Sequence, residues 1–286
     1  MITCQSIGDA LESWAPLAFQ AEYDNSGLLV GDPTKELTGV LVALDVTEEV
    51  IREAKTRGCN LVVTHHPILF KGIKRLTGRT EVERCVMLAM ELGVALYAAH
   101  TNLDSIEGGV SHALAGALGV QPERILAPRA ALLYTLNVHT PVEAADQVSE
   151  ALFAAGAGRI GAYDECHFSV PGTGTFRPLE GAQPSEGVVG ERSAVPEVQQ
   201  SFVVSKECRG AVQRALEEAH PYEVVAHSWI SLENERSDVG YGVIGQMAQP
   251  MPWDHFVAHV KGALGVKALR HSPLVKATVQ RIALCG

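Results

Sequence analysis

The stretch LVVTHHPILF, residues 61–70, decides both the fold and the first candidate site. Its first four residues are apolar or β-branched, which is typical of a strand buried within a sheet. Two histidines follow at once, and Pro67 disfavours the helical backbone region for His66. We therefore expect His66 to stay extended, so that the rings of His65 and His66 diverge at the carboxyl end of the strand.

Strands and helices alternate on both sides of this stretch. A helix capped by Ser6 is expected at the start of the chain, and a second helix capped by Thr47 is expected just before the strand. The remaining segments are extended over 26–32, 37–47 and 94–99, and helical over 81–93 and 108–119. This alternation predicts an α/β fold, with layers of helices on a mostly parallel sheet.

Metal-binding side chains gather at the ends of two of these strands. His65 and His66 end one strand, and His100 and Asp104 follow another in AAHTNLD, residues 98–104. In open α/β sheets ligands bind beyond the carboxyl ends of the strands. Imidazole and carboxylate groups suit zinc, iron and manganese, so the residues indicate a divalent-metal site. Ordinary polar residues at strand ends, or an iron oxygenase with two histidines and one carboxylate, fit the same pattern.

Two further residue types stand near this pattern. Asp45 follows an apolar strand, and it is expected either to support the metal site or to cap the helix at Thr47. Cys59 and Cys85 are expected to be small core residues rather than ligands. The six cysteines show no CxxC spacing, which favours reduced thiols in a cytoplasmic protein.

Composition excludes several classes of protein. The chain has 286 residues, of which 47% are hydrophobic and 20% charged, and its formal net charge is -10. Lysine and arginine form no run that would track phosphates, so nucleic acid is not an expected partner. The sequence contains neither a secretory signal nor an apolar run long enough to span a bilayer, so no membrane association is expected.

The middle of the chain has a different character. Strands are expected over 132–141, 197–205 and 222–232, and helices over 142–158 and 206–220, which favours a small ferredoxin-like α+β domain. The glycine-rich segment 172–191 is expected to be a loop or short hairpin, because GTGTF lacks the GK[ST] of a phosphate-binding loop. HPYE, residues 220–223, is expected to end a helix. A helix over 253–266 and a final parallel strand over 277–286 follow.

These motifs resemble a known family. DNSGLLVGDP (24–33), LVVTHHPILF, AAHTNLD, GYGVIG (240–245) and RIALCG (281–286) are similar to the Nif-three-like family, whose members are also described as GTP cyclohydrolase I type 2 homologues. Residues 155–184 and 219–228 resemble the PII-like (CutA-like) domain inserted in longer bacterial members. The resemblance implies a core of two similar halves, with residues 1–130 as the first half, 131–236 as the insert and 237–286 as the start of the second half.

The resemblance also implies a metal centre and an assembly. His65, His66 and Asp104 correspond to family ligands, and His100 is expected to be a supporting residue behind them. The family's remaining ligands, a His and a Glu four residues apart, would follow Gly286. We therefore expect at most one ion here, where complete members hold two, and an apolar strand over 279–285 that is prone to association. A homohexamer is implied as well.

Two functions follow from the resemblance. The first is a metal-dependent hydrolase of a small substrate, nucleotide-derived if the cyclohydrolase label applies. The alternative is a non-catalytic metal-binding or regulatory hexamer, whose PII-like domain senses a small molecule or caps the ring.

Overall fold

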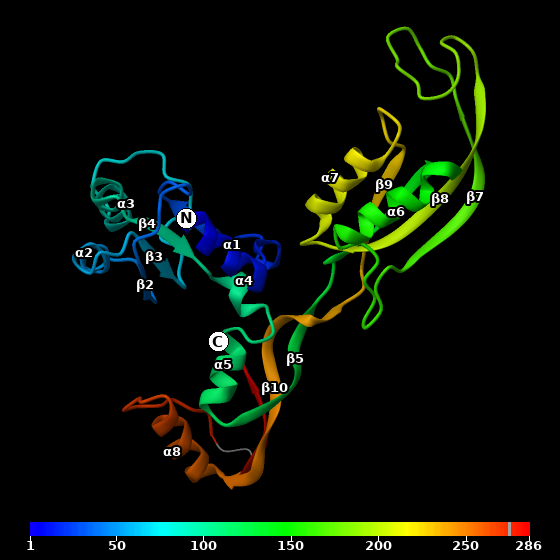
Figure 1. Ribbon diagram of the computed structural model, residues 1–286. Helices are drawn as coiled ribbons and strands as arrows, with labels where there is room; N and C mark the ends of the chain where they lie inside the picture. The colour runs from blue at the N-terminus through cyan, green and yellow to red at the C-terminus, as the bar shows by residue number, and fades with distance from the viewer. Residues whose placement is uncertain (274–275) are drawn as a thin grey trace. The chain divides into compact units, whose positions relative to one another are not determined.

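The structure is a computed structural model that describes residues 1–273 and 276–286. It is a mixed α/β fold with several sheets, and the chain divides into two compact units (Figure 1). The first unit comprises Met1–Pro128 and Ser237–Gly286, and the second comprises Arg129–Arg236. Among the described residues, the helices are all too short or too polar to cross a bilayer.

The first sheet of the first unit carries the histidine motif. Its elements in chain order are α1 (Cys4–Trp14), a short 3-10 helix η1 (Leu17–Phe19), β1 (Gly27–Val30), β2 (Val40–Ala43), α2 (Glu48–Thr56), β3 (Leu61–Thr64), α3 (Glu81–Leu92) and β4 (Ala95–Ala98). The strand order is β1-β4-β3-β2. Strands β2, β3 and β4 run parallel, and β1 joins β4 in the antiparallel sense.

Helices cover both faces of this sheet. Residues of α2 and α3, among them Ile51 and Leu88, share one apolar cluster with Val62 and Leu96 of the strands. On the other face, Cys4 of α1 belongs to a second cluster with strand residues. Every residue of β4 is buried, as expected for a central strand with helices on both faces.

Threonines begin the helices of this layer. Thr47 caps α2 as the sequence predicts, since its side chain accepts a hydrogen bond from the Val50 N–H. The cap predicted for α1 is wrong, because Thr3 is the N-cap and the helix begins at Cys4. The Thr3 hydroxyl accepts from the Ser6 N–H at 3.2 Å, and Ser6 accepts in return from the Thr3 N–H at 3.1 Å. Ser6 is therefore the third helical residue of a capping box.

A second, three-stranded sheet completes the first unit. It contains β5 (Val120–Arg129), β10 (Arg236–Pro252) and β11 (Thr278–Leu284) in the order β11-β10-β5, with α4 (Thr101–Asp104), α5 (Val110–Ala117) and α8 (Trp253–Ala263). The prediction of a parallel final strand is wrong, because β11 pairs antiparallel with β10. An intervening helix usually returns a chain in the parallel sense, and strand composition does not encode direction.

The second unit is a four-stranded antiparallel sheet with two helices. Its elements are β6 (Leu133–Pro141), a 3-10 helix η2 (Val142–Ala144), α6 (Ala145–Ala154), β7 (His167–Phe176), β8 (Ser193–Ser205), α7 (Arg209–Ala219) and β9 (His227–Leu232), and the strand order is β7-β8-β6-β9. Both helices pack on the sheet through one apolar cluster that includes Val148, Phe202 and Leu216. GTGTF forms the end of β7, which pairs antiparallel with β8, so of the predicted loop or short hairpin the hairpin is found here and the tight turns expected at these glycines are wrong.

Candidate metal centre

Three histidines converge where two neighbouring parallel strands end. His65 and His66 follow β3 directly, and His100 lies two residues beyond the end of β4. Because β3 and β4 are parallel neighbours, their carboxyl ends meet at one edge of the sheet. The ring centroids are 5.1 Å apart for His65 and His66, 5.1 Å for His65 and His100, and 5.7 Å for His66 and His100. One ligand nitrogen of each ring lies within 4.8 Å of the others.

The opposite nitrogen of each ring is held by an oxygen. His65 donates from Nδ1 to the Ala99 carbonyl at 2.9 Å. His66 donates from Nδ1 to Asp45 Oδ1 at 2.7 Å, and His100 donates from Nδ1 to Asp24 Oδ1 at 2.8 Å. This network assigns the proton of each neutral ring to Nδ1 and leaves Nε2 as a free lone pair. Metal-binding histidines use the same arrangement, in which the outer acceptor fixes the tautomer and the ring orientation.

Asp104 adds a carboxylate to the three rings. It lies in α4, and its Oδ1 is 3.7 Å from His65 Nε2. Oδ1 is buried and has no hydrogen-bond partner among the described residues. Burial raises the pKa of Asp104, while the charges of His65 and His100 act in the opposite direction. A buried carboxylate oxygen without a donor is costly unless a cation neutralises it, so these residues fit a divalent ion.

Asp24 is the anchor behind His100. Its side chain is fully buried, and it accepts hydrogen bonds from His100, from the Thr101 N–H at 3.0 Å and from the Thr101 hydroxyl. Burial alone would raise the pKa of Asp24, but these hydrogen bonds outweigh it and lower the pKa to about 2. Asp24 is therefore a fixed anion that holds the His100 ring in one orientation.

Comparison with known proteins agrees with this architecture. The sequence profile of Duf34/NIF3 (NGG1p interacting factor 3) matches residues 2–286. The chain belongs to the DUF34/NIF3 family. Proteins called GTP cyclohydrolase 1 type 2 homolog, from Halalkalibacterium halodurans and from Bacillus subtilis, are each 38% identical to it over 283 residues, which is 99% of this chain and 76% of the relative.

Solved structures show the same fold. A Bacillus cereus protein related to NIF3 superposes with a TM-score of 0.79 at 37% identity, and the match covers 100% of this chain and 76% of that one. A Staphylococcus aureus protein matches with a TM-score of 0.71 at 27% identity, over 100% of this chain and 75% of the other. The mixed α/β architecture is therefore that of NIF3-related proteins.

The structure of this DUF34/NIF3 chain places the histidines and Asp104 at the same edge of the sheet, but the ligand set of His65, His66 and Asp104 stays a prediction. The three rings converge on one another, so His100 joins the group instead of standing behind it. Asp104 lies 3.7 Å from His65 alone by its nearest measured contact, and the group of side chains that could share an ion consists of the three histidines. Asp45 supports His66 and does not cap the helix that follows it.

Sequence reasoning missed Asp24. It opens DNSGLLVGDP, one of the family-like motifs, but its role depends on a hydrogen bond to His100, 76 residues away. Among the cysteines, Cys85 of α3 is buried in the core cluster and Cys59 packs against it partly buried, as the sequence predicts.

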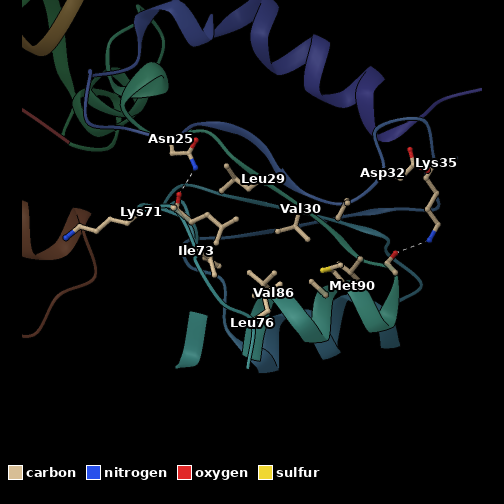
Figure 2. A pocket seen from close by; sticks show the side chains of 17 residues that line it. Asn25, Leu29, Val30, Asp32, Lys35, Lys71, Ile73, Leu76, Val86 and Met90 are labelled. Atoms are coloured by element: carbon tan, nitrogen blue, oxygen red, sulfur yellow. Dashed lines mark hydrogen bonds between the residues drawn. The ribbon is translucent and has the colours of Figure 1, made fainter. Parts of the chain in front are cut away.

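A cavity lies beside this layer but is separate from the histidines. Its volume is about 760 Å³, and it is lined by β1, α3 and the segment 69–76 (Figure 2). The walls are mostly apolar, with Val30, Ile73 and Met90 pointing inward, while Lys35 donates to the Gly93 carbonyl at one end at 3.2 Å. None of the three histidines lines it.

Proposed function

We propose that this chain is a divalent-metal-binding protein that acts as a metal-dependent hydrolase on a small, nucleotide-derived substrate. The observation that carries the proposal is the buried Oδ1 of Asp104, which lies without a donor beside His65 Nε2. Three imidazoles in the same tautomer converge on that region. Such a donor set has the chemistry of a cation site.

The described residues divide the work between binding and orientation. His65, His66, His100 and Asp104 would hold one ion, and zinc, iron and manganese all suit these donors. A divalent ion in such a site supplies Lewis-acid activation of water or of a substrate oxygen. Asp24, Asp45 and the Ala99 carbonyl accept the Nδ1 protons and so fix the direction of each ring, which leaves Nε2 as the nitrogen that would bind the ion.

The names of the relatives suggest the first substrates to test. Several are called GTP cyclohydrolase 1 type 2 homolog, and hydrolytic opening of a purine ring is a reaction that a Lewis-acidic cation can support. GTP and simple phosphoesters are therefore the substrates of choice.

A second function rests on the second unit. Residues 129–236 form a compact unit of their own with the element order βαββαβ. We interpret this unit as an inserted PII-like domain in a homohexamer, where it would sense a small molecule or cap the ring while the histidines bind metal without catalysis.

Metal analysis and hydrolysis assays separate the two functions. We expect the purified protein to retain a divalent ion through dialysis and to hydrolyse GTP or a phosphoester, and we expect His66→Ala to lose both properties. His255→Ala, on the exposed side of α8, is the matched control. Metal binding with no hydrolysis of any of these substrates would favour the non-catalytic function, and activity that survives His66→Ala would refute the hydrolase at this site.

A further inference from the structure

The second unit contains a cavity of about 460 Å³ that the proposed hydrolase does not use. It lies between the end of β7, the segment 177–186 and the residues that follow α7. Phe176, Leu179, Tyr222 and Val224 contribute apolar or aromatic walls. Volume and lining match those of sites for small organic molecules.

Glu197 is the buried charge of this cavity. It lies on β8, and only 9% of its surface is exposed. The Tyr222 hydroxyl donates to its Oε1 at 2.9 Å, whereas Oε2 has no hydrogen-bond partner within residues 1–273 and 276–286. Burial, followed by this hydrogen bond and the charge of Glu197, raises the pKa of Tyr222 and keeps the phenol a donor. One carboxylate oxygen is thus fixed, and the other is free to accept.

The glycine-rich end of β7 makes room for this carboxylate. A Cβ atom at Gly174 would collide with the carboxylate of Glu197, so only glycine allows the side chain to lie against the strand. The glycine of GTGTF at position 174 therefore lets the buried Glu197 carboxylate lie directly against the backbone of β7.

HPYE fixes the other side of the cavity. His220 is 6% exposed, donates from Nε2 to the His139 carbonyl at 3.0 Å and accepts at Nδ1 from the Tyr222 N–H at 3.1 Å. Glu223 accepts from the Gln183 N–H at 3.2 Å, which ties the segment 177–186 to this motif. Two motifs without a role in the metal centre thus line one pocket around Glu197.

Charge indicates the kind of ligand. Three carboxylates line the cavity, those of Glu186, Glu197 and Glu223, against one cation, Arg177. The described residues bring three metal-binding groups together only at His65, His66 and His100, so the carboxylates here do not form a cage for an ion. We propose that this cavity binds a small organic cation, whose ammonium or amidinium group donates to the free oxygen of Glu197 while the apolar walls cover its body.

Benzamidine, a planar amidinium on an apolar ring, tests the proposal by calorimetric titration of the full chain. We expect saturable one-to-one binding, and at least about tenfold weaker binding of neutral benzamide and anionic benzoate, because both lack the charged donor. Glu197→Gln should weaken benzamidine binding by about tenfold or more. Its amide oxygen still accepts from Tyr222, so the fold is retained. Glu180→Gln, an exposed carboxylate on the same segment, should bind like the parent protein.

Gly174→Ala gives a second test, since the added methyl group should displace the Glu197 carboxylate and weaken benzamidine binding in the same direction. Metal content at the histidines should be unchanged in both variants. Absence of saturable benzamidine binding, equal affinity for benzamide, or unchanged affinity in Glu197→Gln would each overturn the proposal.

Discussion

Asp24 offers the sharpest test of how the metal centre is built, and the informative change is Asp24→Asn. The carboxylate is fully buried and both of its oxygens are in use. Oδ1 accepts from His100 Nδ1 at 2.8 Å, and Oδ2 accepts from the Thr101 N–H at 3.0 Å and from the Thr101 hydroxyl. Asparagine keeps the shape but replaces one acceptor oxygen with an amide donor.

The magnitude follows from these bonds. If the amide oxygen of asparagine keeps the bond to His100, its NH₂ group faces the backbone N–H of Thr101. That buried N–H then has no acceptor, which costs about 1–3 kcal/mol. The surviving bond to His100 also exchanges a charged acceptor for a neutral one, which reduces its contribution from about 1.5–3 to about 0.5–1.5 kcal/mol. Asp24→Asn should therefore lower the free energy of unfolding of the first unit by about 2–4.5 kcal/mol.

Asp45→Asn is the matched control for this change. Asp45 makes the equivalent hydrogen bond to His66, but its side chain is 58% exposed and water can replace what is lost. We expect a loss within about 0.5–1 kcal/mol, measured by urea denaturation followed by circular dichroism. Equal losses for the two variants would refute the reasoning, because burial would then not decide the strength of these outer hydrogen bonds.

Two further predictions concern the frame around the sites. Leu96→Ala, at a position in β4 that is 1% exposed, should cost about 2–5 kcal/mol by denaturation, whereas Val42→Ala, 77% exposed on the edge strand β2, should stay within about 0.5 kcal/mol. Burial lowers the pKa of His220 below its usual 6.5, so its contribution to the stability of the second unit should be present above that pH and lost as pH falls through the folded-state pKa. Denaturation at pH 8 and pH 5 should show this slope, and His220→Gln should make it shallower.

The convergence of the histidines could be predicted because it depends on periodicity and chain direction alone. Apolar segments separated by helices imply parallel strands, and parallel strands end at one edge. His65, His66 and Asp104 follow from that rule, and so does His100, which lies beyond β4 much as His65 lies beyond β3.

Asp24 could not be predicted as a partner of His100, because the two residues come from segments far apart in the chain. Asp24 precedes β1, the strand that pairs antiparallel at the edge of the sheet, and nothing in its own segment marks His100 as its partner. The role of Gly174 could not be predicted for a related reason. Two glycines close together favour a turn, yet Gly174 makes space for Glu197 from the next strand. Local sequence propensity predicts backbone conformation, whereas the roles of Asp24 and Gly174 depend on contacts with side chains from distant segments.

The same contrast separates features that serve stability from those that serve a ligand. Ala99, Asp24 and Asp45 satisfy the outer nitrogens of the three rings, so the network is complete on the side away from the cluster. On the inner side, Asp104 has a buried oxygen with no donor within the described part of the chain. A network optimised only for folding would supply a donor there or remove the charge. The outer ring nitrogens are all hydrogen-bonded, while the buried oxygen of Asp104 has no donor. This combination is typical of a site that binds a cation.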